Sequence, residues 1–394
     1  MAEAVVRLAN GGVSVPPPLS LYVHLPWCVK KCPYCDFNSH AAQGIPEAAY
    51  IDALVADLET ALPDIWGRRI HTVFFGGGTP SLFSPEGIDR ILTAVRTLTP
   101  LVPGAEITLE ANPGTVEAAR FRGYREAGVT RLSLGIQSFD PRHLRALGRI
   151  HDEREARRAA ELAATHFDTF NLDLMYALPG QTLDEALGDI ETALGFGPPH
   201  LSAYQLTLEP NTPFGHTPPA NLPDDDLAAD MQDRIESRLA AAGLQHYETS
   251  AFARPGEACR HNLNYWQFGD YLGIGAGAHG KLSFHDRIVR QMRVKHPQQY
   301  MDAVRAHAQV AETRSLGRDD LPFEFMMNAL RLVDGVPAEL YQARTGLALP
   351  AAANVLQEAR ARGLLAAEAH TLQATPRGRR FLNDLLPLFL PDRP

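Results

Sequence analysis

The sequence predicts an α/β fold in which a parallel β-sheet is followed by a smaller helical domain. Six short apolar stretches alternate with segments of helical periodicity, and polar or glycine-rich residues directly follow each stretch. Strands repeated in this way need crossover helices, which are right-handed and place the strands parallel in one sheet. From about Arg318 onward the pattern changes to short helices, so we expect a second unit there.

The six predicted strands follow one another along the chain. They cover residues 21–25, 72–75, 106–110, 130–136, 170–176 and 201–208. Helices are expected at 47–62, at 85–98 and at 224–243. A further helix is expected to begin at 115, after the third strand, and others to follow the fourth strand and end at about 166. Ser84 and Pro85 form a typical helix start, because serine caps free N–H groups and proline suits the first helical position. Ligands of such sheets bind at the carboxyl ends of the strands.

The composition is that of a globular chain and excludes several classes of protein. The 394 residues are 45% hydrophobic and carry a formal net charge of -9, which argues against binding to nucleic acid. No apolar run reaches the roughly 18 residues of a membrane span. Four cysteines in a chain of this length do not form a disulfide framework, so we expect a reducing compartment and a cytoplasmic protein.

Three of the four cysteines, Cys28, Cys32 and Cys35, stand in a CxxxCxxC pattern. Three thiolates this close cannot all pair as disulfides, and they leave a tetrahedral zinc site one ligand short. They suit a 4Fe–4S cluster with one open iron, which can chelate a small molecule through its amino and carboxylate groups. The alternative is a zinc loop completed by His24 or His40, which is weaker because zinc cysteines usually come in CxxC pairs.

Residue types that can bind a ligand follow several of the predicted strands. The glycines at 76–78 let backbone approach a ligand, although a glycine run also makes a plain tight turn. Glu110 ends an apolar strand, where a carboxylate needs ribose hydroxyls, an ammonium or a core arginine as partner. Gln137 follows the fourth strand, and Arg149 beyond it suits a carboxylate. Asp173 stands in a run too apolar for a surface charge, so together these residues predict a ligand site.

These motifs resemble those of the HemN/HemW branch of the radical S-adenosylmethionine (SAM) superfamily, and the HemW family much more than HemN. The stretch Leu-Tyr-Val-His-Leu-Pro-Trp-Cys-Val-Lys-Lys-Cys-Pro-Tyr-Cys-Asp-Phe-Asn-Ser-His begins at Leu21, and further matching stretches begin at Gly76, Glu110, Gly135, Leu147, Asn171 and His261. The resemblance covers nearly the whole chain and implies a partial (β/α)6 barrel of the TIM type.

The resemblance also implies the residues that hold the cofactors. The cluster ligands would be Cys28, Cys32 and Cys35, with the aromatic Tyr34 as a further cofactor-binding residue beside the last of them. The SAM contacts would come from Tyr22, Gly77, Gly78, Thr79, Glu110, Gln137, Arg149 and Asp173.

Two features separate the two families of this branch. HemN-like oxygen-independent coproporphyrinogen III oxidases carry a fourth cysteine two residues after the third, where this chain has Phe37. They also place a long N-terminal extension over the substrate, whereas about twenty residues precede the first predicted strand here. HemW-like proteins resemble the chain in both respects and are haem chaperones that deliver haem to haem-dependent membrane enzymes.

The resemblance therefore implies haem as cargo. The alternative is an oxygen-independent coproporphyrinogen III oxidase or another radical SAM porphyrin enzyme. A chaperone would contact haem-acceptor membrane enzymes, such as respiratory enzymes, transiently and at the periphery of the inner membrane. We expect no nucleic-acid partner. The sequence leaves the oligomeric state open, with a homodimer as one alternative.

A second candidate site is His-Asn-Leu-Asn-Tyr-Trp from His261, a stretch associated in this family with haem handling. His261 could ligate the iron, while Tyr265 and Trp266 offer flat faces to a porphyrin. The structural alternative is aromatic packing at the open edge of the barrel, since aromatic residues mostly lie in cores. His279 is expected to face the mouth of the active site. Cys259 is expected to be a buried thiol rather than a fourth cluster ligand.

The expected domains follow from these segments. Residues 1–20 form a flexible lead-in, 21–245 the barrel with its cluster, 246–317 an extension that carries the His-Asn-Leu-Asn-Tyr-Trp stretch, and 318–394 a winged-helix-like, α-rich domain. In the last, helices are expected at 322–332, 337–345, 350–362 and 376–390, with a hairpin from 363–365 and 371–373. The recognition surface expected of a winged helix is not strongly basic here apart from Arg377, Arg379 and Arg380, so we expect a lid or docking surface rather than DNA binding.

Overall fold

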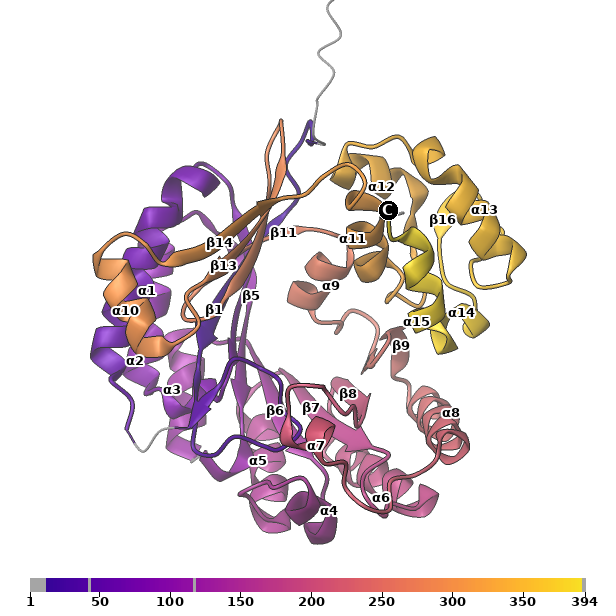
Figure 1. Cartoon of the computed structure of the whole chain (residues 1–394). Helices are drawn as coiled ribbons and strands as arrows, with labels where there is room; N and C mark the ends of the chain where they lie inside the picture. Colours follow the sequence, from indigo (N-terminus) through magenta and orange to yellow (C-terminus); the bar gives the residue numbers. More distant parts are fainter. Residues whose placement is uncertain (1–11, 42–43, 116–117, 392–394) are drawn as a thin grey trace, which may run out of the picture.

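The computed structural model describes residues 12–41, 44–115 and 118–391, and its largest part is an open barrel of strands with helices outside (Figure 1). The six predicted strands are present, parallel and side by side in chain order. They are β1 (Leu19–Leu25), β4 (Ile70–Gly77), β5 (Leu101–Ala111), β6 (Arg131–Gln137), β7 (Thr169–Tyr176) and β8 (His200–Gln205). The predicted α/β fold class is therefore confirmed.

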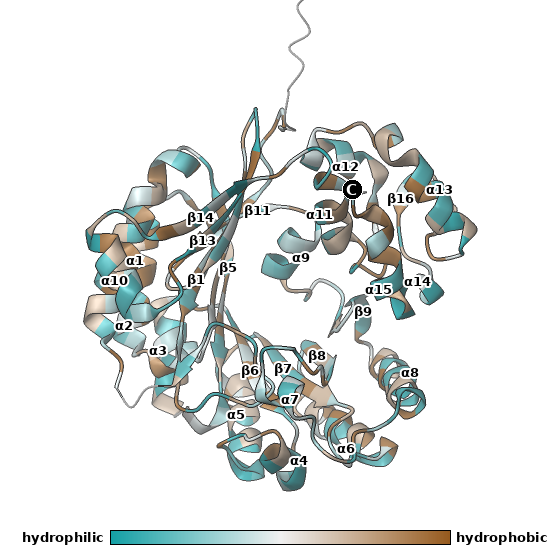
Figure 2. Cartoon of the chain, viewed as in Figure 1, coloured by the Kyte–Doolittle hydropathy of each residue, from teal (hydrophilic) through white to brown (hydrophobic). Residues whose placement is uncertain are grey.

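The helices between these strands, together with α8 after the last of them, pack on the outside of the sheet. They are α1 (Glu47–Ala61), α2 (Pro85–Leu98), α3 (Ala118–Ala127), α4 (Pro141–Ala146), α5 (Glu153–His166), α6 (Leu183–Leu194) and α8 (Asp225–Ala241). The hydroxyl of Ser84 accepts a hydrogen bond from the N–H of Gly87, so the predicted cap of α2 is confirmed. In Figure 2 these helices carry both hydrophilic and hydrophobic residues, as amphipathic helices do.

The two faces of strand β1 contribute to different regions: one to the hydrophobic core and the other to the barrel interior. Leu19, Leu21, Val23 and Leu25 alternate along it and belong to the hydrophobic core. The residues between them are Ser20, Tyr22 and His24, which point to the other face of the sheet. On that face the hydroxyl of Ser20 accepts hydrogen bonds from Thr72 and from Asn264. The apolar pattern of the strand thus leaves polar side chains in the barrel interior.

The sheet continues beyond both ends of the six parallel strands, which the sequence did not predict. On one side lie β11 (Asp270–Ile274), which is parallel to β1, and then the antiparallel β12 (His279–Ser283), β13 (Ile288–Arg293) and β14 (Val310–Ser315). On the other side lie β10 (Ala251–Ala253) and β9 (Gln245–Glu248). β14 and β9 are the two edges of this sheet in the described part of the chain, so the barrel is open.

Several short elements complete this part of the fold. They are β2 (Trp27–Cys28), β3 (His40–Ala41), η1 (Leu62–Ile65), η2 (Pro80–Leu82), η3 (Pro113–Thr115), α7 (Pro213–His216), α9 (Arg260–Trp266) and α10 (Pro297–Arg305). Helix α9 contacts β1, β4 and β11, and it lies inside the curve of the sheet (Figure 1). The predicted barrel interior is thus partly filled by the His-Asn-Leu-Asn-Tyr-Trp stretch.

The C-terminal part has a hydrophobic core of its own. It contains α11 (Leu321–Ala329), β15 (Val336–Pro337), α12 (Ala338–Thr345), η4 (Leu349–Ala352), α13 (Ala353–Ala361), β16 (Thr371–Leu372), α14 (Pro376–Arg380), α15 (Leu382–Leu385) and η5 (Leu386–Phe389). The expected last helix is interrupted at Phe381, and β16 pairs with β15 rather than with residues 363–365. Leu365 instead makes an isolated bridge with Ala374.

The predicted lead-in, residues 1–20, falls partly outside the described residues, which begin at residue 12. Within the described part, Val13 is 1% exposed and packs in the core of the C-terminal part. Strand β1 begins at Leu19, two residues earlier than expected. The last residues of the lead-in are therefore structured, because they complete both cores.

Candidate cofactor site

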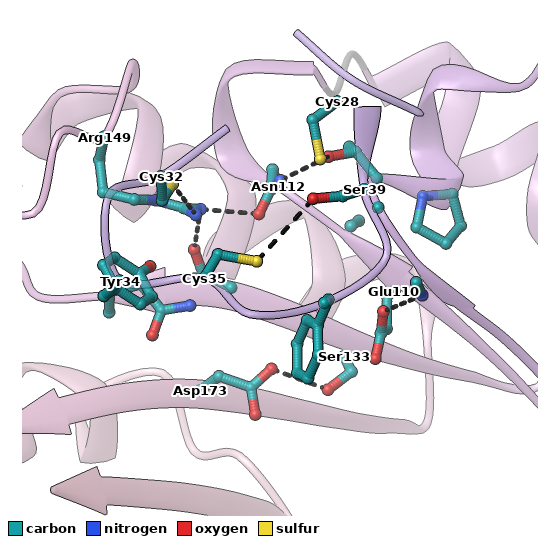
Figure 3. Close-up of a pocket in the computed structure, with 18 of the residues that line it drawn as sticks. Cys28, Cys32, Tyr34, Cys35, Ser39, Glu110, Asn112, Ser133, Arg149 and Asp173 are labelled. Atoms are coloured by element: carbon teal, nitrogen blue, oxygen red, sulfur yellow. Dashed lines mark hydrogen bonds between the residues drawn. The ribbon is translucent and has the colours of Figure 1, made fainter. Parts of the chain in front are cut away.

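A pocket of about 320 Å³ opens at the carboxyl ends of the parallel strands, where the sequence predicted a ligand site (Figure 3). The cysteine loop after β1 forms one side, and residues of β4 to β8 and the loops after them form the rest. The predicted residues that it brings together are Cys28, Cys32, Tyr34, Cys35, Gly77, Gly78, Thr79, Glu110, Gln137, Arg149 and Asp173. Tyr22, His261 and His279 are not among the residues that line it.

The three predicted cluster ligands lie at the end of β2 and on the loop after it, and they form no disulfide. All three are partly exposed, and each thiol faces a polar neighbour. The hydroxyl of Thr79 donates to Sγ of Cys28 at 3.6 Å, and Oγ of Ser39 lies 3.9 Å from Sγ of Cys35. Hydrogen bonds of this kind stabilise thiolate ligands and tune a cluster. Three partly exposed thiols beside an open pocket fit a 4Fe–4S cluster with one free iron.

The spacing of the thiols disfavours the zinc alternative. Among the described residues, the one group of three potential ligands whose atoms lie within 4.8 Å of one another is Asp140, His143 and Glu185. The cysteines are therefore too far apart to share one zinc ion, whose Zn–S bonds are about 2.3 Å. His24 is also engaged, because its ring nitrogens bond the hydroxyl of Tyr22 at 3.1 Å and the carbonyl of Asn38 at 2.9 Å.

Arg149 and Asn112 connect the first cysteine to the second. Nη1 of Arg149 donates to Sγ of Cys32 at 3.6 Å, and Nη2 donates to Oδ1 of Asn112 at 2.7 Å. Nδ2 of Asn112 in turn donates to the hydroxyl of Thr79 at 2.8 Å, and that hydroxyl reaches Cys28. Figure 3 shows the guanidinium pointing at the cysteine loop. The buried Nε of Arg149 has no partner among the described residues.

Glu110 lies across the pocket from the cysteines and is largely buried. Its carboxylate accepts a hydrogen bond from the N–H of Gly77 at 3.2 Å. Burial, helped by the nearby charge of Asp173, raises the pKa of Glu110 to about 8. A ligand that donates to this carboxyl would compensate the cost of burying it.

Asp173 is held by three donors at the end of β7. Its Oδ1 accepts from Asn171 at 2.7 Å and from the hydroxyl of Tyr204 at 2.9 Å, while Oδ2 accepts from Ser133 at 3.0 Å. The carboxylate is thereby fixed in orientation at the pocket wall (Figure 3). The run around Asp173 is apolar because Phe170, Leu172 and Leu174 alternate with the inward-facing residues and belong to the hydrophobic core.

The glycines after β4 are required by close contacts. Gly77 has φ +115°, and a Cβ there would lie 2.5 Å from the ring of His24. A Cβ at Gly78 would lie 2.5 Å from the carbonyl oxygen of Trp27. These positions bring the N–H of Gly77 to Glu110, so the glycine run is more than a plain turn.

Three further predicted contacts, Tyr34, Gln137 and Tyr22, differ in their position relative to the pocket. Tyr34 lies near Phe214, and burial raises its pKa. Gln137 has φ +70°, an uncommon conformation for a residue with a side chain, and it lines the pocket. The hydroxyl of Tyr22 bonds His24 and its ring stacks on Phe74. The structure therefore places Tyr22 behind the pocket wall, as a support for His24.

His261 does not have the geometry expected of an exposed haem ligand. Its side chain is fully buried, Nδ1 bonds the hydroxyl of Thr72 at 2.8 Å and Nε2 bonds the hydroxyl of Tyr265 at 2.7 Å. Burial lowers its pKa to about 3. An iron could bind only if one of these bonds were broken, so the geometry favours the structural alternative for this stretch.

Two other predictions concern His279 and Cys259. His279 begins β12, is exposed, and stands at the end of the sheet where the parallel strands carry the pocket, although it does not line that pocket. Cys259 is fully buried and donates to Oε1 of Glu106 at 3.6 Å. The expectation of a buried thiol is confirmed.

Sequence reasoning missed three residues that shape the pocket: Asn112, Ser133 and Tyr204. Asn112 stands two residues after Glu110, and its position next to Pro113 was the available signal. Ser133 shares a strand face with Gly135, and its role depends on pairing with β7, which no local pattern reveals. Tyr204 reads as one more apolar residue of its strand.

Comparisons with known proteins identify the family. Residues 22–193 match the Radical SAM superfamily, and residues 316–381 match the HemN C-terminal domain. The chain is 52% identical over 377 residues to the heme chaperone HemW of Escherichia coli, covering 95% of this chain and 98% of that protein. It is 39% identical to the heme chaperone HemW of Mycobacterium tuberculosis, covering 92% of each.

A mitochondrial relative and a solved structure extend the comparison. The mouse radical S-adenosyl methionine domain-containing protein 1 is 37% identical and is covered over 87% of its length. The solved structure of coproporphyrinogen III oxidase (HemN) from Escherichia coli superposes with a TM-score of 0.80 at 24% identity, covering 95% of this chain and 90% of that one. At this identity the likeness shows the fold alone. None of the helices in the described part of the chain has the length and apolar character that crossing a bilayer requires.

Proposed function

Because the chain belongs to the HemW family within the radical SAM superfamily, we propose that it is a haem chaperone. It binds haem and passes it to haem-dependent enzymes, with a SAM-bound 4Fe–4S cluster as part of the machinery. The similarity to a heme chaperone over 98% of that protein's length carries the proposal. The pocket supports it, since three thiols and a set of acidic and amide groups converge there.

The chain's own residues have distinct roles in this proposal. Cys28, Cys32 and Cys35 hold the cluster, which supplies an open iron for the amino and carboxylate groups of SAM. Arg149 orients Asn112 and faces Cys32, so it places positive charge where a carboxylate would lie. Glu110 then receives hydrogen bonds from the far end of the ligand.

Asp173, Gln137 and the backbone of residues 77–79 complete the proposed SAM contacts. Asp173 is already oriented by Ser133, Asn171 and Tyr204. Tyr22 acts through His24, which packs against Gly77. Tyr34 covers the cysteine loop from the side of α7.

The alternative function is oxidation of coproporphyrinogen III by radical chemistry. The position of the fourth cysteine of HemN-like enzymes holds Phe37 here, and its side chain is 63% exposed at the pocket. An exposed phenyl ring beside the cluster cannot ligate a metal and offers a contact for an apolar partner instead. This favours the chaperone.

We further propose where the chaperone acts. It meets haem-acceptor membrane enzymes transiently at the periphery of the inner membrane and otherwise remains cytoplasmic. The unit at 318–394 serves as the docking surface or lid, and the barrel with its extension at 246–317 serves as the cofactor-binding unit. A homodimer is the assembly to test by light scattering.

One experiment separates the two functions. The cluster-loaded protein is titrated anaerobically with haem, and difference absorption spectra are recorded against the same protein without haem. In parallel it is incubated with coproporphyrinogen III, SAM and a reductant. We expect a Soret band that saturates and no coproporphyrinogen turnover. Steady formation of protoporphyrinogen IX without haem binding would overturn the proposal.

A further inference from the structure

Asn112 lies between two of the predicted cluster ligands and is not one of them. It follows strand β5, is partly buried, and lines the cysteine pocket between Arg149 and Cys28 (Figure 3). Its backbone N–H donates to the hydroxyl of Ser81 at 3.4 Å, while its side-chain amide takes part in the contacts around the thiols. An amide outside the proposed SAM contacts therefore stands at the centre of the cysteine network.

The orientation of this amide follows from its partners. Nη2 of Arg149 lies 2.7 Å from one amide atom, and a guanidinium can only donate, so that atom is the oxygen Oδ1. The nitrogen Nδ2 then lies 2.8 Å from the hydroxyl oxygen of Thr79 and donates to it. Asn112 thus accepts a hydrogen bond on one side and donates one on the other.

The donated hydrogen bond decides where the proton of Thr79 points. A threonine hydroxyl has a single proton, and because its oxygen accepts from Asn112, that proton is directed to a second partner. The sulfur of Cys28 lies 3.6 Å from the hydroxyl oxygen and receives it. Thr79 is 3% exposed, so water competes little for the proton. The amide of Asn112 therefore directs a hydrogen bond onto the first cysteine.

The oxygen of the same amide holds Arg149 in place. Nη2 of Arg149 donates to Oδ1 of Asn112 and to the carbonyl of Gly135, each at 2.7 Å. With Nη2 held in this way, Nη1 reaches the sulfur of Cys32 at 3.6 Å. Gly135 leaves room for this arrangement, because a Cβ there would lie 2.8 Å from Oδ1 of Asn112. One amide thus positions the donors of two thiols.

Donors at the sulfurs change how readily a cluster accepts an electron. The reduced cluster carries one more negative charge than the oxidised cluster. Hydrogen bonds and positive charge beside the sulfurs stabilise that added charge and so raise the reduction potential. Thr79 supplies a neutral hydrogen bond and Arg149 a charged one, and both side chains are held by Asn112.

Resting on the proposed cluster, we propose that Asn112 is a positioning residue that raises the reduction potential of the cluster. It directs Thr79 to Cys28 and Arg149 to Cys32, and it ligates no iron itself. The electron comes from an external donor, and this role makes or breaks no covalent bond.

The first test uses Asn112→Leu, which keeps the approximate size of the side chain and removes its hydrogen bonds. The full-length protein is reconstituted anaerobically without SAM, and the reduced cluster is followed by EPR during titration with dithionite and redox mediators. At a fixed potential we expect the ratio of reduced to oxidised cluster to fall at least about tenfold, a shift of about 59 mV for a one-electron couple. Asn383→Leu, at an exposed position of the C-terminal part, is the control and should titrate as the unchanged protein does.

The second test asks whether Asn112 acts through Thr79. Thr79→Val removes the hydroxyl and keeps the shape of the side chain. In the Thr79→Val background, Asn112→Leu should lower the potential less than it does alone, because part of its effect is already lost. A merely structural role of Asn112 would not produce this dependence. Equal shifts in the two backgrounds would contradict the path through Thr79.

The outcomes separate this role from the function on which it rests. If the unchanged protein forms the cluster and Asn112→Leu titrates at the same potential, the positioning role is wrong and the proposed function stands. If the unchanged protein forms no cluster, the proposed cofactor itself fails. If Asn112→Leu loses cluster iron, Asn112→Asp replaces it, because a carboxylate still accepts from Arg149 but cannot donate to Thr79. This variant should also lower the potential, and an unchanged value would overturn the role.

Discussion

At the scale of single residues, the cofactor pocket is defined by pairs of groups that would be costly to bury alone. Arg149 faces Cys32, Asn112 connects it to Thr79, and Thr79 reaches Cys28. The thiols are thereby surrounded by hydrogen-bond donors, and donors stabilise the thiolate form that a cluster requires. Removal of single members should therefore affect the cluster or the ligand and leave the fold intact.

The first prediction concerns the cluster itself. Cys28→Ser, Cys32→Ser and Cys35→Ser should each lose the 4Fe–4S cluster on anaerobic reconstitution, because each removes one of its three thiolates. Cys259→Ser is the matched control, since Cys259 is buried beside Glu106 and away from the pocket. Iron and sulfide analysis gives the answer. Full iron content in any of the first three, or a loss of a quarter in the control, would contradict the ligand assignment.

The second prediction concerns SAM affinity. Glu110→Ala and Asp173→Ala should each weaken SAM at least about tenfold, since a charge-assisted hydrogen bond contributes roughly 1.5–3 kcal/mol. Calorimetry with the cluster-loaded variants measures this. Asp168→Ala, on an exposed carboxylate paired with Arg125, is the control and should bind SAM normally. Unchanged affinity in both test variants would mean that SAM lies elsewhere.

The third prediction uses the raised pKa of Glu110, which burial brings from 4.5 to about 8. At a pH between these two pKa values, the folded protein retains a proton at Glu110 that the unfolded chain releases. The contribution of this carboxyl to stability therefore falls as pH rises through that window, by at most about 1.4 kcal/mol per pH unit, and is constant above it.

Glu110→Gln cannot titrate and should lack this loss. The melting temperatures of the SAM-free protein and of Glu110→Gln, measured from pH 5 to pH 8.5, should diverge in favour of the variant as pH increases. A difference that stays constant across the range would show that Glu110 is not held protonated in the folded state.

At the scale of elements, helix α9 shows why the sequence left two interpretations of the His-Asn-Leu-Asn-Tyr-Trp stretch open. It has no cap of its own, and Glu106 on β5 receives the thiol of Cys259 and the N–H groups of Arg260 and His261. The helix is thus fastened inside the barrel by a residue far away in sequence. The aromatic residues of the motif can be recognised in the sequence, but no local pattern reveals that Glu106 is the distant partner of this helix.

The fourth prediction tests this anchor. Glu106→Ala should lower the free energy of unfolding by about 1–3 kcal/mol, because buried donors at the start of α9 lose their acceptor. Urea denaturation measures the change. Glu312→Ala, on the exposed strand β14, removes a carboxylate of the same kind and should have almost no effect. Equal stability of the two variants would mean that α9 is held by packing alone.

The same scale explains which elements could be predicted. β1, β4, β5, β6, β7 and β8 are covered by helices and therefore read as apolar runs, so six strands and their order followed from the sequence. β14 is exposed at all six positions and has no apolar pattern at all. β9 and β10 are too short to show a period. Their places in the sheet depend on long-range pairing, which local periodicity does not encode.

At the scale of the whole molecule, the C-terminal part covers an edge of the sheet. Glu248 on β9 makes an antiparallel bridge with Leu332, and the N–H of Val333 donates to the carbonyl of Tyr247 at 3.0 Å. Arg331 adds an ion pair with Glu248 at 3.1 Å and lies over the ring of Trp266, 4.3 Å from its centroid. This contact protects an edge strand.

The last prediction is that Arg331 keeps the two parts together. Arg331→Ala leaves the mostly buried Glu248 without its cation, which should destabilise the contact between the two parts by about 1–3 kcal/mol. The population of molecules in which the two parts have separated should then increase at least about fivefold. Hydrogen exchange of peptides that cover residues 245–250 and 330–335 should accelerate by that factor, while peptides of β1 and β4 should not change. Arg305→Ala, whose exposed partner Asp302 lies on the same helix, is the control and should exchange normally. Acceleration spread over the whole sheet would instead mean that Arg331 stabilises the fold globally, and the two parts would then open only by unfolding.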